Sequence, residues 1–211
     1  GIERVKFNTS FPRDFNSDIV DAINENENLC NWVHLPVQSG SDRVLRAMKR
    51  GHTIDAYKRK IDYLKESKRN IALTTDVIVG FPGETAEDFQ ATADLFEYCK
   101  FDAAYIFKYS PRPGTPAFAM GDDVTLEDKN VRFQELDRVL RRNQHLALER
   151  YKGAKLSVLP ERNSSKSDED LTGHSTCHKV VNFRGPVSLL GSLVDVRITE
   201  IKANSFYGKI C

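Results

Sequence analysis

Polar side chains follow several apolar, β-branched segments of the chain, and they are of types that bind small ligands. Asp76 stands inside the apolar segment 71–79, where a carboxylate is costly to bury unless it is paired or bonded to a ligand. Because the ligands of parallel α/β folds collect at the carboxyl ends of the strands, these positions predict a ligand site there. The polar segment ends are Thr9-Ser10, Gln38-Ser39-Gly40-Ser41, Gly80 and Lys108-Tyr109-Ser110.

Each of these features also has an ordinary structural explanation. Gln38–Ser41 could only cap the following helix, and Asp76 could be satisfied by a neighbouring Lys or Arg. His34 in an apolar segment is more typical of a satisfied core histidine, and Arg50 alone is typical of a solvated helix end. Taken singly, none of them identifies a function.

The segments that must position these residues alternate between strand-like and helix-like patterns over the first 150 residues. We expect strands over 5–9, 32–38, 71–79 and 103–109, and helices over 17–26, from 41 or 42, from 53, from 85, and from 125 to about 151. Such alternation implies right-handed βαβ units and a parallel sheet. Four strands are too few to close a barrel, so the sequence predicts the C-terminal part of a partial (βα) barrel.

The pattern changes after Gly153, where short β-branched runs replace the helices. We expect five strands, over 155–159, 179–183, 189–190, 193–198 and 206–210, with the polar stretch 163–170 as a separator. This pattern is typical of a small OB-like closed β-barrel. The sequence thus predicts an α/β domain over 1–150 and an all-β domain over 151–211.

Composition excludes several classes of protein. No apolar run approaches the roughly 20 residues that a membrane helix needs, so we expect no membrane partner. The four cysteines, Cys30, Cys99, Cys177 and Cys211, are scattered singly, which offers no zinc knuckle, CxxC pair or iron–sulfur motif. Isolated thiols fit a reducing cytoplasm. The formal net charge is +1, with the basic excess in the segment after residue 150, which favours a polyanion partner there.

Four motifs in fixed order carry a resemblance to a known family. His34–Ser41, Met48–Gly51, Asp76–Thr85 and Phe107–Pro116 together resemble the radical S-adenosylmethionine (SAM) methylthiotransferases. The match is closest to the branch that makes 2-methylthio-isopentenyladenosine in tRNA. Leu171–Phe183 resembles the core of that family's TRAM domain, an RNA-binding β-barrel. The resemblance covers essentially the whole chain and implies a partial radical SAM barrel followed by a TRAM domain.

The resemblance also implies roles for individual residues. Arg50 would meet the methionyl carboxylate of SAM, and Asp76 would accept hydrogen bonds from its ribose hydroxyls. Gln38 would approach SAM from its strand end. The complete cofactor-binding set that the resemblance implies is Gln38, Ser39, Arg50, Asp76, Ile78, Tyr109, Ser110 and Ser10.

The family reaction reduces a [4Fe–4S] cluster bound to SAM, which gives a radical that abstracts hydrogen from carbon 2 of isopentenyladenosine beside the anticodon. A second [4Fe–4S] cluster delivers sulfur, and an electron donor is required. The CxxxCxxC motif that holds the first cluster and the three cysteines that hold the second are absent from this chain. We therefore expect a fragment that is inactive alone, with its catalytic residues unknown and no metal ligands of its own.

The resemblance to a TRAM domain predicts an RNA-binding face that meets the anticodon stem-loop of tRNA. Its expected residues are His174, His178, Lys179, Asn182 and Arg184, which combine phosphate-binding and base-stacking types. A solvated barrel face is the plain alternative, and His174, Cys177 and His178 could mimic a metal site but lack a fourth ligand nearby.

Two functional alternatives stay open at this point. One is a non-catalytic tRNA-binding fragment, and the other is the sister branch that methylthiolates a ribosomal protein. The slightly basic barrel and the run Val180–Phe183 favour RNA over a protein substrate.

Overall fold

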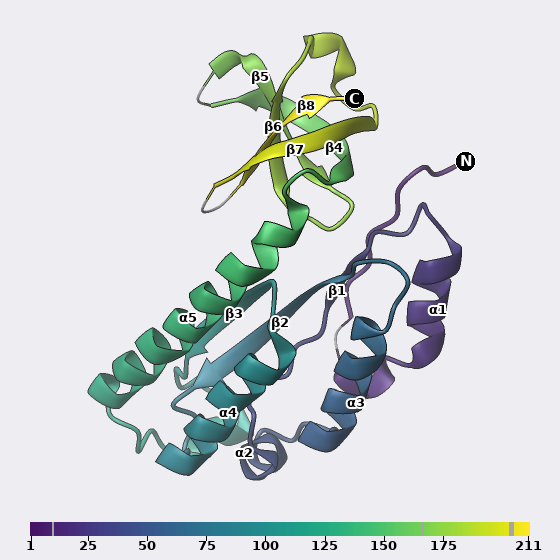
Figure 1. Ribbon diagram of the computed structural model, residues 1–211. Coiled ribbons are helices and arrows are strands. Elements are labelled where there is room, and N and C mark those ends of the chain that lie inside the picture. The colour runs from purple at the N-terminus through teal and green to yellow at the C-terminus, as the bar shows by residue number, and fades with distance from the viewer. Residues whose placement is uncertain (10, 166, 203–204) are drawn as a thin grey trace. The chain divides into compact units, whose positions relative to one another are not determined.

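The computed structural model describes residues 1–9, 11–165, 167–202 and 205–211, and these form two compact units (Figure 1). The first unit contains 7–25 and 33–144 and holds the α/β elements. The second contains 1–6, 26–32 and 145–211 and holds a β-barrel. The barrel unit therefore draws on two short segments from early in the chain, which no sequence pattern indicated.

The α/β unit is built on a three-stranded sheet in the order β1-β2-β3. Strand β1 (Trp32–His34) is short, β2 (Ala72–Val79) is central, and β3 (Ala103–Lys108) pairs with it in parallel from Thr74↔Ala103 to Val79↔Lys108. The helices are α1 (Ser17–Glu25), α2 (Asp42–Ala47), α3 (Ile54–Lys65), α4 (Ala86–Cys99) and α5 (Leu126–Leu148), with 3₁₀ turns at Pro12–Asp14, Pro116–Met120 and Glu149–Tyr151. This confirms the predicted parallel α/β class.

Local capping signals explain why the helices begin where they do. The side chains of Ser41, Thr53 and Thr85 accept hydrogen bonds from the first turns of α2, α3 and α4. Thr85 and Asp88 form a reciprocal capping box, which satisfies two donors that a helix start would leave unpaired. Each cap stabilises its helix by about 1 kcal/mol. The helices begin within one residue of the predicted starts, which confirms those predictions.

The core of the α/β unit lies between the sheet and its helices. Leu35, Leu45, Tyr57, Ile61 and Phe101 are fully buried. Burying a large apolar side chain stabilises the fold by roughly 1.5–3 kcal/mol, so each of these residues contributes substantially to stability. The hydroxyl of Tyr57 reaches the Leu35 carbonyl at 2.8 Å, so its polar atom is also satisfied.

The predicted strand over 5–9 is wrong. Val5 forms only one isolated parallel bridge, with Leu29, and the residues after it form no ladder. Thr9 instead donates its side-chain hydroxyl to the His34 carbonyl. That side-chain bond takes up a β1 acceptor that a neighbouring strand would otherwise use. The predicted strand over 32–38 is likewise shorter, with Gln38 returning as an isolated parallel bridge to Val77.

The barrel unit closes in the order β4-β5-β6-β8-β7. Its strands are β4 (Lys155–Ser164), β5 (Ser167–Ser175), β6 (Val180–Arg184), β7 (Val194–Ile201) and β8 (Phe206–Ile210). Val158, Val181, Phe183, Val196 and Phe206 fill its interior. The predicted small closed β-barrel is confirmed.

Two details of the barrel prediction are wrong. Residues 163–164 belong to β4 and residues 167–170 to β5, so these parts of the stretch predicted as a separator form strands, because side chains of a small barrel can be polar on the outer face. Leu189 ends a 3₁₀ turn (Val187–Leu189) instead of starting a strand. No helix within the described ranges is long and apolar enough to cross a bilayer.

Candidate functional site

A cavity of about 510 Å³ lies at the carboxyl ends of the strands of the α/β unit. Its lining includes six of the predicted ligand-binding residues: Gln38, Arg50, Asp76, Ile78, Tyr109 and Ser110. These come from β2, from the segment that follows β1, from the turn after α2, and from the chain just past β3. The structure therefore brings together residues that are up to 72 positions apart in the sequence.

One described residue of the predicted set does not join this group. Ser39 is fully buried, and its hydroxyl accepts a hydrogen bond from the Ser41 amide, so it does not line the cavity. Its neighbour in sequence, Gln38, does. Ser10 lies outside the described residues.

The backbone of Gln38 adopts a left-handed conformation, with φ of 71°. Such a conformation is uncommon for a residue other than glycine and persists only where the surroundings enforce it. Here the Gln38 amide donates to the Asp76 carbonyl and the Ile78 amide donates to the Gln38 carbonyl, both at 2.9 Å. The end of β2 therefore fixes the direction in which the chain turns at the cavity.

Arg50 places a cation at the cavity, and its guanidinium lies 5.5 Å from the centre of the Phe11 ring. Its guanidinium is half-buried, and within the described part of the chain no carboxylate forms an ion pair with it. Burial lowers its pKa from the usual value, and the charge of Asp76 only partly opposes this. A desolvated guanidinium beside a cavity favours a bound anion, above all a carboxylate or phosphate that it can grip with two bonds.

Asp76 is less buried than the sequence indicated, since its side chain is 28% exposed at the cavity. The Nε2 atom of His34 lies 3.4 Å from one carboxylate oxygen, and the Nδ1 atom lies 3.0 Å from the Thr74 hydroxyl. His34 is thus satisfied by side-chain neighbours, as its ordinary reading predicted. Asp76 keeps oxygen acceptors facing the cavity, where ligand hydroxyls could donate.

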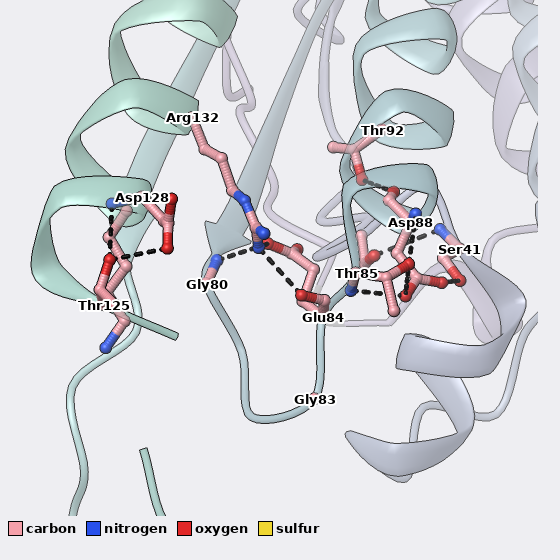
Figure 2. Close-up of polar contacts among 12 residues, drawn as sticks. Ser41, Gly80, Gly83, Glu84, Thr85, Asp88, Thr92, Thr125, Asp128 and Arg132 are labelled. Atoms are coloured by element: carbon pink, nitrogen blue, oxygen red, sulfur yellow. Dashed lines mark hydrogen bonds and ion pairs between the residues drawn. The ribbon is translucent and has the colours of Figure 1, made fainter. Parts of the chain in front are cut away.

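The turn that follows β2 is held by a buried carboxylate (Figure 2). One oxygen of Glu84 accepts from the Gly80 amide at 2.7 Å and from Arg132 of α5 at 2.6 Å. Burial raises the pKa of Glu84, although the hydrogen bonds from Gly80 and Arg132 work in the opposite direction. The Gly80–Gly83 turn is therefore tied at both ends and to a helix from much later in the chain.

A second carboxylate fixes the loop that carries Gln38 (Figure 2). Asp88 of α4 accepts from the Ser41 hydroxyl at 2.6 Å, from the Thr85 amide at 2.9 Å, and from Arg43. Burial opposes ionisation of Asp88, but the bonds from Arg43 and Ser41 outweigh it and hold its pKa well below the usual range. The Gly40 amide adds a bond of 2.8 Å to Thr92. The loop is thereby fastened to the first two turns of α4.

The sequence patterns did not identify several residues in and around the site. Phe81 and Phe107 line the cavity, and Phe81 packs edge-on against Tyr109 with ring centroids 5.3 Å apart. Lys129 of α5 is almost fully buried, pairs with Asp122 and lies 5.4 Å from the Tyr109 ring. Phe81 and Phe107 belong to the quoted motifs and could have been included, but nothing in the sequence marks Lys129 as buried.

The two histidines predicted to bind RNA lie together on the barrel unit. The His174 and His178 rings stack with centroids 4.6 Å apart. Lys6 lies 3.0 Å from His178 Nε2 and 4.0 Å from the centre of the Trp32 ring. Burial, with the charges of Lys6 and His174, lowers the pKa of His178 to about 4. His178 is therefore neutral at pH 7, and its ring packs on that of His174 and against that of Trp32.

The other predicted RNA-binding residues lie on the same β5–β6 hairpin but have different partners. Asn182 is engaged within the sheet, where it accepts from Thr172 at 2.5 Å. Arg184 is exposed and pairs with Glu169 at 2.9 Å. Lys179, half-buried, follows His178 at the start of the β6 hairpin. The His174 and His178 rings are thus in contact with each other, whereas Asn182 contacts Thr172 and Arg184 contacts Glu169.

The residues present do not fit an iron–sulfur cluster. Cys30, Cys99 and Cys177 are buried, Cys211 is exposed, and none of them lines the strand-end cavity. Among the described residues, no group of three or more His, Cys, Asp or Glu is arranged to hold a metal ion.

Comparison with known proteins agrees with this geometry. Residues 1–96 match the Radical SAM superfamily, and residues 149–211 match the TRAM domain. The chain is 46% identical over 210 residues to the tRNA-2-methylthio-N(6)-dimethylallyladenosine synthase of Magnetococcus marinus, and 45% identical to that of Legionella pneumophila. These matches cover the whole chain, 48% of the first protein and 47% of the second, so the chain spans about half the length of the relatives it matches.

The fold also occurs among solved structures. Coproporphyrinogen III oxidase from Escherichia coli, a radical SAM enzyme, superposes with a TM-score of 0.56 at 15% identity, which covers 97% of this chain and 50% of that one. At this identity the likeness concerns the fold alone. The family matches, the relatives and the fold agree with the motifs, and the chain belongs to the radical SAM proteins that also carry a TRAM domain.

Proposed function

We propose that this chain is the SAM-binding and RNA-docking portion of a tRNA methylthiotransferase. The reaction is methylthiolation of carbon 2 of isopentenyladenosine beside the anticodon. The observation that carries the proposal is the strand-end cavity, which a guanidinium, a carboxylate and apolar side chains line together. The relatives that match the whole chain are named for the same modification of tRNA.

The volume of the cavity lies in the range of small-molecule sites, and the chemistry of its lining supports SAM as the ligand. Arg50 would hold the methionyl carboxylate, and Asp76 would accept from the ribose hydroxyls. Ile78, Phe81 and Tyr109 supply the apolar and aromatic surface that an adenine ring requires. When bound together with a reduced iron–sulfur cluster, SAM supplies the radical chemistry of the family. This chain contributes the walls that bind and orient it.

The iron–sulfur clusters must be held elsewhere. We propose that two [4Fe–4S] clusters are bound by cysteines of the complete gene product, because the four cysteines of this chain do not converge. An external electron donor would reduce the first cluster. We also propose that the protein works in the cytoplasm, where tRNA is modified.

The barrel unit supports RNA as the partner. We propose residues 1–150 as the partial radical SAM domain with its helical extension, and residues 151–211 as the TRAM domain that docks the anticodon stem-loop. Lys179 and Arg184 offer cations to the phosphate backbone, whereas the neutral His178 and its neighbour His174 offer stacked rings.

The test is nucleoside analysis of reacted tRNA. The complete gene product, loaded with iron and sulfide under reducing conditions, is expected to convert isopentenyladenosine in tRNA to its 2-methylthio form, detected by mass spectrometry. Methylthiolation of a ribosomal protein, with tRNA unchanged, would assign the protein to the sister branch and refute the proposal. SAM cleavage without any methylthiolated product would also contradict it.

A further inference from the structure

A groove of positive charge adjoins the strand-end cavity within the α/β unit. A second cavity of about 400 Å³ is lined by Arg13, Arg46 and Lys60 and shares Arg50 with the strand-end cavity. A third, of about 360 Å³, shares Ala56 and Lys60 with the second and adds Arg59. We call the second and third cavities together the α2–α3 groove, because α2, α3 and the segment that joins them supply most of its lining.

The charge of the groove is one-sided. Five cationic side chains line it, whereas Asp42 is the one carboxylate found there within the described residues. Asp42 accepts a hydrogen bond from the Ile54 amide at 2.8 Å, at the start of α3, and is occupied in that way. His52 adds no charge at neutral pH, since burial lowers its pKa.

The cations are also little neutralised by their surroundings. Arg46 and Arg59 are exposed, and the described parts of the chain hold no carboxylate that forms an ion pair with either of them. Lys60 donates to the Phe15 carbonyl, which satisfies a proton but leaves the positive charge in place. Arg13 forms an ion pair with the adjacent Asp14, whose charge also acts on Lys60. Like charges around a concave surface repel one another unless an anion lies between them.

We propose that the α2–α3 groove binds the sugar–phosphate backbone of the RNA strand that carries the reacting nucleotide. This inference rests on the proposed function and adds the path that the RNA follows. Arg50 belongs to both the groove and the strand-end cavity, so a backbone in the groove passes the mouth of the site where a base must enter. Guanidinium groups match phosphate oxygens in pairs, and four of the five cations are arginines.

The experiment measures the salt dependence of RNA binding by the 211-residue chain. A fluorescent anticodon stem-loop RNA is titrated at 50 and 200 mM KCl, and binding is followed by anisotropy. The test variant is the double charge reversal Arg46→Glu/Arg59→Glu, at two exposed positions where the fold should tolerate it. The matched control is Arg138→Glu/Arg141→Glu on α5, which makes the same change in net charge at exposed positions outside the groove. Circular dichroism checks that all variants fold.

The groove predicts a loss of about two phosphate contacts in the test variant. The slope of log K against log salt should then become shallower by about 1.4. The factor by which the rise in salt lowers the affinity should therefore be about sevenfold smaller for the variant than for the original chain. Affinity at 50 mM should fall roughly tenfold in the test variant and change far less in the control. Equal slopes and affinities in the test and control variants would overturn the proposal, as would RNA binding by the original chain that ignores salt.

A free phosphate ion is the rival occupant, and a separate arm addresses it. Inorganic phosphate is titrated by calorimetry into the original chain and the test variant. Loss of phosphate binding with unchanged RNA affinity would assign the groove to a small anion and refute the RNA path. The methylthiolation assay keeps the two proposals apart. An active enzyme with a silent groove refutes only the groove, whereas salt-dependent groove binding without methylthiolation refutes only the proposed reaction.

Discussion

The contact between Gly40 and helix α4 gives a sharp prediction about how the site is held. A Cβ atom at position 40 would overlap the Ala91 carbonyl oxygen and the Thr92 Cα, and would lie 2.6 Å from the Thr92 amide nitrogen. All three are backbone atoms of a helix, which cannot move aside as a flexible side chain can. The substitution Gly40→Ala must therefore push the loop away from α4.

The energetic cost follows from the contacts that such a shift breaks. The bond from the Gly40 amide to Thr92 and the bond from Ser41 to Asp88 are both buried. A neutral bond is worth about 1 kcal/mol and one to a charged group about 2 kcal/mol, so we expect a loss of about 3 kcal/mol. With a urea dependence of about 2 kcal/mol per molar, the unfolding midpoint should fall by about 1.5 M.

Urea unfolding followed by far-ultraviolet circular dichroism measures this loss. The matched control is Gly51→Ala, where the nearest neighbour of an added Cβ is the flexible Arg13 side chain at 3.5 Å. That change should alter stability by less than about 0.5 kcal/mol. If Gly40→Ala were as stable as Gly51→Ala, the close packing of the loop on α4 would be wrong.

Two further predictions concern charge. For the buried pair Glu84–Arg132, a double-mutant cycle of Glu84→Gln and Arg132→Met in urea unfolding should show a favourable coupling of roughly 1–3 kcal/mol. The exposed pair Asp137–Arg141 should show a coupling of less than about 0.5 kcal/mol. Equal couplings would contradict the tie between the Gly80 turn and α5. For His178, a folded-state pKa of about 4 against an ordinary 6.5 means that the unfolded chain binds more protons between these values, so stability should fall as the pH drops through this window. The unfolding is followed by the fluorescence of Trp32, the single tryptophan, whose ring centre lies 5.4 Å from that of His178. In the variant His178→Gln, stability should decline less steeply as the pH drops. Identical pH profiles of stability in the two proteins would refute the lowered pKa of His178.

Local signals made much of the fold predictable. Ser41, Thr53 and Thr85 begin helices because each places a side-chain acceptor against unpaired amides, and that information lies within four residues. The β-branched run of β2 is buried on both faces, as a central parallel strand requires. The residues of the strand-end cavity followed from strand ends and motif order, and six of them do line one space.

The remaining features depend on contacts between distant residues. Thr9 reaches the His34 carbonyl with its side chain, which no local pattern reveals. Gly173 in β5 permits a close approach to the Leu159 backbone of β4, a strand many residues earlier in the chain. Arg4 donates to the His174 carbonyl at 2.8 Å and so fastens the start of the chain to the barrel. Periodicity describes one element at a time and cannot show such pairings.

The central claim is that the strand-end cavity binds SAM through Arg50. The most direct measurement is the affinity of the complete gene product for SAM by calorimetry, with Arg50→Met and Arg50→Lys compared with Arg138→Met on the exposed face of α5. We expect Arg50→Met to weaken binding roughly tenfold to a hundredfold, Arg50→Lys to restore only part of it because the paired bonds are lost, and Arg138→Met to leave it unchanged. Unaltered SAM affinity in Arg50→Met would contradict the claim.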